Sequence, residues 1–242
     1  MLDPFALHAV LTGDVIGSSS LKGEESDRLV EMLHETFDRA RAPIDRESSE
    51  DWPVETAFEV FRGDSWQLYV SDPSLGLCVA LAFRAWFRVL SGADTRMALA
   101  VGPARQLNLI QVGHSQGPAF EDSGHRLDAL GRRTFDCVIR TATSDSTRQR
   151  LFDVMASAVG AFAADWTRAQ AQAVAFMLTL EPMDGEYPQQ AQIAEAWPPE
   201  PIRQQTVSGH LGKAHWSELS NYLEIYESEL SDIVTDWIGF PR

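Results

Sequence analysis

The first part of the chain alternates short apolar runs with longer amphipathic stretches. Residues 6–11 are almost all apolar and stop at Thr12-Gly13-Asp14, which predicts a buried strand that ends in a tight turn. Residues 24–41 place apolar side chains three or four positions apart, which predicts a helix with one buried face. Residues 42–53 are polar and contain two prolines, so we expect a loop there.

A hairpin and further alternating elements follow. Residues 54–61 and 65–70 are rich in β-forming residues and flank Arg62-Gly63-Asp64, as the two strands of a hairpin would. The same reasoning predicts helices at 75–90, 119–130 and 147–166, strands at 96–101 and 134–140, and a further candidate strand at 106–112. Hairpin strands with helices between them indicate an α+β fold rather than a doubly wound parallel sheet.

From residue 167 onward the pattern is helical. Helices are expected at 167–180, 189–197, 202–216 and 219–237. We therefore divide the chain near Trp166 into an α+β domain, residues 1–166, and an all-α domain, residues 167–242. The last helix carries an apolar stripe that suggests a homodimer seam, with folding back onto the chain's own domains as the alternative: Leu219, Leu223, Tyr226, Leu230, Ile233 and Trp237.

Composition narrows the functional classes. The 242 residues carry 20 Lys and Arg against 35 Asp and Glu, a net charge of −15. This balance argues against a nonspecific binder of the nucleic-acid backbone, which needs clustered positive charge. No apolar run reaches about 18 residues, and the N-terminus lacks a basic leader. The sequence therefore predicts a cytoplasmic protein without a membrane partner.

Two aspartates at predicted turns are the strongest candidates for chemistry. Asp14 follows the first strand and Asp64 lies at the hairpin tip, and in a β-α-β-β sheet these points can be neighbours. Two adjacent carboxylates repel unless a cation lies between them, and Mg²⁺ prefers one or two carboxylates together with substrate phosphates. The small loop Gly17-Ser18-Ser19 would leave backbone N–H groups to hold phosphates. The alternative is that each Gly-Asp pair is an ordinary turn.

Four motifs in this order resemble the SatD family of bacterial proteins. They are Thr12-Gly13-Asp14-Val15-Ile16-Gly17-Ser18-Ser19, Phe61-Arg62-Gly63-Asp64-Ser65-Trp66-Gln67, Arg96-Met97-Ala98-Leu99-Ala100-Val101-Gly102 and Gly117-Pro118-Ala119-Phe120. The family has a Gly-Asp-x-Ile-Gly-Ser start, a Gly-Asp-Glu-Phe-Gln-like hairpin and a Gly-Pro-Ala-Phe helix start. The resemblance extends through the helical C-terminus, although Ser65 and Trp66 replace the Glu-Phe of the family hairpin.

The SatD pattern is in turn similar to class III nucleotidyl cyclases and, more distantly, to GGDEF domains. The resemblance implies a cyclase-like or ferredoxin-like sheet in which two aspartates hold divalent ions, Mg²⁺ or Mn²⁺, over a nucleoside triphosphate. It also implies a homodimer, because those cyclases form their sites between two such domains. The matching positions are Asp14 and Asp64 for the metal-binding aspartates, the backbone carbonyl of Val15 for a third metal ligand, and Ile16, Gly17, Ser18 and Ser19 for the phosphate-binding loop.

A later helix of those cyclases carries an Asn and an Arg that stabilise the transition state. Here Arg126-Leu127 matches the Arg-Leu pair, which makes Arg126 the candidate catalytic residue. Asp122 stands where Asn is expected, with one extra residue before it, and an Asp there would repel a triphosphate. Alternatively, Arg126 pairs with Asp122, four residues earlier on the same helix face.

The helical part resembles a helix-turn-helix unit. Residues 189–196 match its first helix, and residues 203–211 match its recognition helix, with Val207 and Leu211 inward. The outward residues expected to read DNA bases are Arg203, Gln204, Gln205, Thr206, Ser208 and His210. In residues 167–216 three basic residues stand against five acidic ones, which disfavours DNA, and packing against another protein is the alternative.

Two function hypotheses remain open at this point. The first is a SatD-like protein whose divalent-metal-dependent nucleotide site, of nucleotidyl cyclase type, is coupled to a helix-turn-helix module. The second is a noncatalytic transcriptional regulator, or a protein-interaction module, whose cyclase-like domain is degenerate. Turnover of nucleoside triphosphates with Mg²⁺ or Mn²⁺ separates the two hypotheses.

Overall fold

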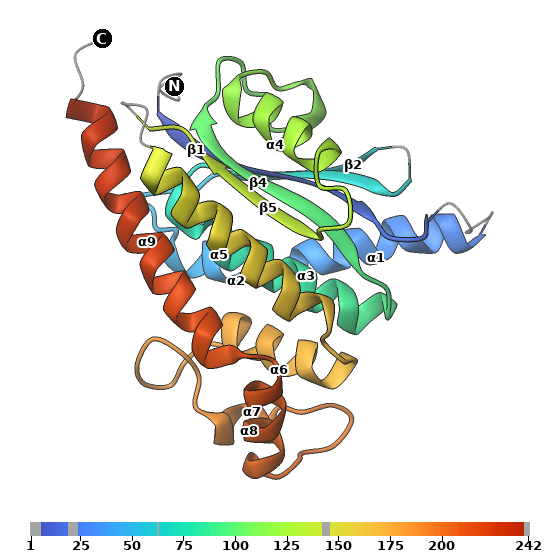
Figure 1. The fold of residues 1–242 in the computed structure, drawn as a ribbon. Helices are drawn as coiled ribbons and strands as arrows, with labels where there is room; N and C mark the ends of the chain where they lie inside the picture. Colours follow the sequence, from blue (N-terminus) through green and yellow to red (C-terminus); the bar gives the residue numbers. More distant parts are fainter. Residues whose placement is uncertain (1–5, 19–23, 62, 142–145, 240–242) are drawn as a thin grey trace.

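A five-stranded sheet forms the centre of the protein (Figure 1). The computed structural model describes residues 6–239, apart from residues 19–23, 62 and 142–145. Across the sheet the strands lie in the order β2-β3-β1-β4-β5. Their bounds are β1 (Leu7–Val15), β2 (Thr56–Phe61), β3 (Ser65–Val70), β4 (Thr95–Pro103) and β5 (Phe135–Ile139).

The directions of the strands make the sheet mixed. β1 pairs antiparallel with both β3 and β4, and β2 pairs antiparallel with β3. β5 runs parallel to β4 at the edge of the sheet. With the helices between them, the first four strands follow the order β-α-β-β-α-β along the chain. The α+β class predicted from the pattern is therefore confirmed.

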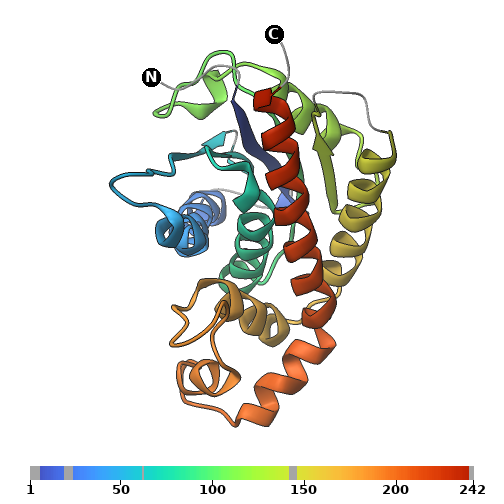
Figure 2. The same cartoon turned by 90° about the vertical axis from the view of Figure 1, so that its left-hand side faces the viewer.

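Helices cover both faces of the sheet, as Figures 1 and 2 show. Alternate β1 residues such as Leu11 point into the core formed with three helices, while Val10 points to the opposite face, under α4. The first face is covered by α1 (Glu24–Ala40), α3 (Gly76–Ser91) and α5 (Ser146–Ala164), and the second by α4 (Pro118–Asp128).

Helix α3 lies at the middle of the larger core. Residues Pro73–Ser91, which include a short 3₁₀ turn (Pro73–Leu75) and α3, are long and apolar enough to cross a membrane. However, 67% of this stretch is buried inside the fold. Its neighbours are the sheet, α1 and α6, so packing within the protein accounts for its apolar composition.

The helical part packs onto this same core. Its elements are α6 (Arg168–Thr179), α7 (Gln190–Glu195), α8 (Gln204–Lys213) and α9 (Trp216–Gly239). α6 lies along α3, and the indole N–H of Trp166 donates to the carbonyl of Ala214 at 3.2 Å. The hydroxyl of Tyr226 on α9 donates to the carbonyl of Pro73 at 2.9 Å. One continuous set of buried side chains thus joins residues on both sides of Trp166.

Three local predictions differ from the structure. The loop expected at 42–53 begins with a short helix, α2 (Ala42–Glu47). The strand expected at 106–112 is absent: a single bridge joins Gln106 to Gln116, and a 3₁₀ turn covers Val112–His114. The tight turn expected at Thr12-Gly13-Asp14 is wrong as well, because β1 continues through all three residues to Val15.

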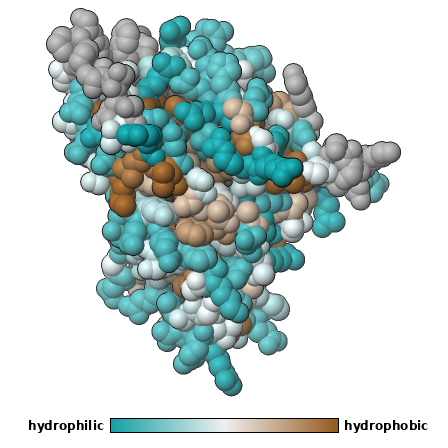
Figure 3. All heavy atoms as spheres, viewed as in Figure 1, coloured by the Kyte–Doolittle hydropathy of each residue, from teal (hydrophilic) through white to brown (hydrophobic). Residues whose placement is uncertain are grey.

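The apolar stripe of α9 is largely buried within the chain itself. Leu219, Leu223, Tyr226, Leu230 and Ile233 all belong to the core, so these five side chains are not open to a second copy. Apolar side chains remain on the surface where α5 and α9 lie side by side (Figure 3). On α5 itself, Leu151 and Val154 are exposed. The folding-back alternative therefore describes most of the stripe.

Candidate functional site

The end of β1 brings the two candidate aspartates to one place. Asp14 lies opposite Ser65 in the β1–β3 pairing, directly beside the hairpin turn that carries Asp64. The N–H of Val15 donates to the backbone carbonyl of Asp64 at 3.2 Å, which fixes the turn against the strand end. Both aspartates line one pocket of about 490 Å³. The structure thus brings the two aspartates together at one pocket, as the sequence predicts for their positions.

Three arginines line the same pocket, and the sequence pattern predicts a role there for none of them. Arg96 comes from β4, while Arg132 and Arg133 follow α4. Arg96 lies opposite Asp14 in the β1–β4 pairing, and its guanidinium donates two hydrogen bonds to the Asp14 carboxylate, one of them at 2.8 Å. The hydrogen bond to Asp14 raises the pKa of Arg96, so the guanidinium stays charged.

Among the described residues, hydroxyl groups rather than a cation contact the carboxylate of Asp64. The side chains of Ser18 and Ser65 both donate to its carboxylate. Among residues 6–239, within the described ranges, no group of three or more His, Cys, Asp or Glu side chains forms a metal site. Asp14 and Asp64 supply two hard oxygen donors of the kind that suits Mg²⁺, and water or phosphate oxygens would complete the coordination.

The loop after β1 is less open to phosphates than the sequence suggested. The N–H of Ile16 donates to the carbonyl of Asp94 at 2.9 Å, so this group is already used. Gly17 adopts a φ of +80°, a left-handed conformation that favours glycine. Ser18 offers a hydroxyl that contacts Asp64. Ser19, the fourth residue of the predicted loop, lies outside the described residues.

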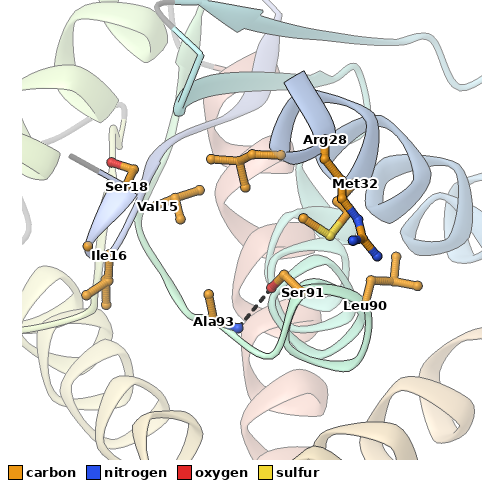
Figure 4. A pocket seen from close by; sticks show the side chains of 10 residues that line it. Val15, Ile16, Ser18, Arg28, Met32, Leu90, Ser91 and Ala93 are labelled. Atoms are coloured by element: carbon orange, nitrogen blue, oxygen red, sulfur yellow. Dashed lines mark hydrogen bonds between the residues drawn. The ribbon is translucent and has the colours of Figure 1, made fainter. Parts of the chain in front are cut away.

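A second pocket lies on the other side of this loop (Figure 4). It has a volume of about 460 Å³ and shares Val15, Ile16, Gly17 and Ser18 with the first pocket. Arg28 and Met32 of α1 face Leu90 and Ser91 at the end of α3 across it. The loop is therefore a wall between a charged pocket and a more apolar one.

The structure does not bring Arg126 to the aspartates. Its guanidinium approaches the carboxylates of Asp136 at 3.4 Å and Asp153 at 3.5 Å, and Arg126 does not line the pocket. The alternative pairing with Asp122 is wrong, because Asp122 binds Arg140 through two hydrogen bonds of 2.7 and 3.0 Å. Helix α4 places Arg126 over β5, where it helps to neutralise the buried Asp136.

A scan against known protein families finds no matching family, and a search of curated proteins finds no match. What the pocket can bind is therefore inferred from its own residues.

The candidate DNA-reading residues lie on and just before α8. Val207 and Leu211 are buried, as predicted, and the outward positions Arg203, Gln204, Gln205, Thr206 and Ser208 are exposed. His210 differs from its prediction, because it is half-buried and stacks on Trp197 with 5.6 Å between the ring centroids. Burial, and then the charge of Lys213, lower the pKa of His210.

The sequence held one usable signal for the missed arginines. Arg96 is the first residue of the motif Arg96–Gly102, and an apolar run follows it. The sequence therefore predicts a strand with a charged residue at its start. Its position opposite Asp14 depends on the β1–β4 register, which the pattern alone does not fix. Arg132 and Arg133 reach the pocket only through the turn after α4.

Proposed function

We propose that the chain is a SatD-like protein that binds a nucleoside triphosphate with Mg²⁺ or Mn²⁺ in the pocket at the end of β1. The observation that carries the proposal is the lining of this pocket by Asp14 and Asp64 together with Arg96, Arg132 and Arg133. Carboxylates can hold a divalent ion and guanidinium groups can hold phosphates, and both occur within one cavity of about 490 Å³.

The topology agrees with this proposal. The β-α-β-β-α-β order and the strand sequence β2-β3-β1-β4 are those of a ferredoxin-like sheet, the type of sheet that the family resemblance implies. In this arrangement Asp14 is the penultimate residue of the central strand and Asp64 occupies the neighbouring hairpin turn. The proposed cyclase-like fold and the proposed nucleotide site therefore support each other.

Each residue has a defined role in the proposal. Asp14 and Asp64 would hold the divalent ion, whose positive charge would stabilise charge on the phosphates. Arg132 and Arg133 would bind phosphate oxygens from the rim, where both side chains are exposed. The more apolar pocket beyond the Val15–Ser18 loop would hold an uncharged part of the ligand. Asp122 stands where the related cyclases carry an Asn that stabilises the transition state, and here it is bound to Arg140. This difference favours binding or sensing of the nucleotide over turnover.

The test compares nucleotide binding by the full chain and two matched variants. Calorimetric titration with each nucleoside triphosphate in the presence of Mg²⁺ should show binding by the wild type and none by Asp64→Asn. Asp45→Asn is the control, because Asp45 is also a hydrogen-bonded carboxylate but lies on α2 and does not line the pocket. Equal binding by Asp64→Asn and the wild type would contradict the proposal. Mass spectrometry of the same mixtures separates turnover from binding.

DNA binding by α8 is the second candidate function. It is favoured by the row of exposed polar side chains that begins at Arg203, just before the helix. Because few cations are available, affinity should fall only shallowly with salt, and Arg203→Ala should weaken it. Arg168→Ala is the control, since Arg168 lies at the start of α6. No mobility shift with any genomic fragment at low salt would favour packing against a protein.

A further inference from the structure

Asp14, a proposed metal ligand, is already paired with Arg96. The two side chains come from adjacent antiparallel strands and are register partners. Arg96 donates from both Nε and a terminal nitrogen, so both carboxylate oxygens of Asp14 are engaged. The guanidinium fork takes one lone pair of each oxygen and neutralises the carboxylate, which lowers its attraction for a divalent ion. Asp14 is therefore a poor metal ligand while Arg96 stays in place.

The pair is nevertheless accessible to solvent. The Arg96 side chain is 36% exposed and the Asp14 side chain 22% exposed, and both lie in the wall of an open pocket. Exposed ion pairs exchange partners readily, because water screens each charge when the pair opens. By contrast, Asp94 holds Arg84 in a pair that is almost fully buried.

A phosphate group offers Arg96 a second partner of the same geometry. A guanidinium fork binds two phosphate oxygens as it binds two carboxylate oxygens. Transfer of Arg96 from Asp14 to a phosphate would leave the Asp14 oxygens open beside Asp64. Before that transfer, Asp64 is the only carboxylate of the described pocket lining that is not bound to a cation. A single carboxylate holds Mg²⁺ or Mn²⁺ weakly, because these ions give up water reluctantly.

We propose that Arg96 is an internal cation that blocks the metal site at Asp14 until a polyphosphate enters the pocket and draws the guanidinium away. This inference rests on the proposed nucleotide function and adds an order of binding to it: the polyphosphate draws Arg96 away first, and the metal then binds Asp14. Metal and polyphosphate then favour each other, because each is bound better once Arg96 has changed partner. Such coupling is reciprocal between the two ligands.

The first measurement is the affinity of the full chain for Mn²⁺ alone. Electron paramagnetic resonance detects the free and the bound ion. Arg96→Gln should raise this affinity by about tenfold, a factor ordinary for coupled sites. Arg132→Gln removes the same charge from the same pocket, and Arg132 has no ion-pair partner among the described residues. It should raise Mn²⁺ affinity only slightly. An equal gain in both variants would show simple charge repulsion and overturn the inference.

A double-mutant cycle with Asp14→Asn gives the decisive readout. In the wild-type background Asp14→Asn should leave the binding of Mn²⁺ alone nearly unchanged, because Arg96 already occupies Asp14. In the Arg96→Gln background the same change should abolish the tenfold gain. If Asp14→Asn weakens Mn²⁺ binding equally in both backgrounds, Arg96 does not block the site. Arg96→Lys, which keeps the charge but not the fork, should give an intermediate affinity and guards against a folding defect in Arg96→Gln.

The premixed complex of Mn²⁺ with inorganic tripolyphosphate separates this inference from the proposed function. The wild type should bind the complex, and Arg96→Gln should bind it more weakly because a phosphate partner is lost. Failure of the wild type to bind the complex would overturn the nucleotide site and this inference together. Binding of the complex without any gain for Mn²⁺ alone in Arg96→Gln would overturn only the blocking role of Arg96.

Discussion

The indole ring of Trp66 lies directly against the Cα of Gly13, on the strand next to its own. A Cβ atom at Gly13 would stand 2.3 Å from Cζ2 of Trp66, closer than any real contact. The indole N–H then donates to the hydroxyl of Thr95, which donates to the carbonyl of Asp14. Gly13 is thus required for close packing, and this packing positions the backbone of Asp14.

Gly13→Ala should therefore destabilise the fold. Overpacking of this kind costs about 1–3 kcal/mol, and here the neighbour is a rigid ring together with backbone. Urea unfolding of the two proteins measures the change. Gly124→Ala is the matched control: the added Cβ meets nothing within 4 Å on α4, so it should leave stability unchanged or raise it by up to about 1 kcal/mol.

Asp94→Asn should be among the most damaging changes near the site. The Asp94 carboxylate accepts hydrogen bonds from Arg84 at 2.9 and 2.7 Å, and also pairs with Arg88. Arg84 is 2% exposed, and removing the partner of a buried charge costs about 3–5 kcal/mol. Thermal and urea unfolding check this. Asp45→Asn breaks the exposed pair with Arg41 and should cost less than about 1 kcal/mol.

The pattern of the sequence was sufficient for most elements and for the position of the two aspartates. Periodicity located the hairpin strands, the long helices and the burial of Val207 and Leu211, because each depends on local spacing. It misread Gly13 as a turn residue, since its close neighbour Trp66 is 53 positions away. It also missed the pairing of Asp14 with Arg96, which depends on the register between β1 and β4.

Arg126→Gln should separate stability from ligand binding. Arg126 contacts Asp136, whose side chain is 1% exposed, so its loss should lower the free energy of unfolding by about 1 kcal/mol. Binding of tripolyphosphate should be unchanged, because Arg126 does not line the pocket. Arg133 also binds Asp136 but does line the pocket, so Arg133→Gln should lower both quantities. Loss of binding in Arg126→Gln would contradict this separation of stability from binding.

Glu227 on α9 should give stability a defined pH dependence. Burial, and then the charges of Glu186, Glu47 and Asp72, raise the pKa of Glu227 above its ordinary value of 4.5. A carboxyl with a raised pKa in the folded state favours folding while it is protonated, so its contribution is lost as pH rises from 4.5 through the raised value. Glu227→Gln should therefore be more stable than the wild type at pH 7, with no difference below pH 4.5.

Unfolding curves collected across this pH range test the assignment. Glu224→Gln is the control, because Glu224 lies on the same helix but does not line the pocket that holds Glu227 and its acidic neighbours. A pH-independent difference between the wild type and Glu227→Gln would contradict it.

The buried hydroxyl of Tyr226 joins α9 to the residues just before α3, which are 153 positions earlier in the chain. During synthesis, the sheet and α3 leave the ribosome well before α9 exists. Until residues 216–239 emerge, the surface that α9 later covers is open to chaperones and to other nascent chains. The part of the core around Pro73 that Tyr226 covers therefore stays exposed until α9 emerges, and a ribosome that stalls before this point leaves that surface uncovered.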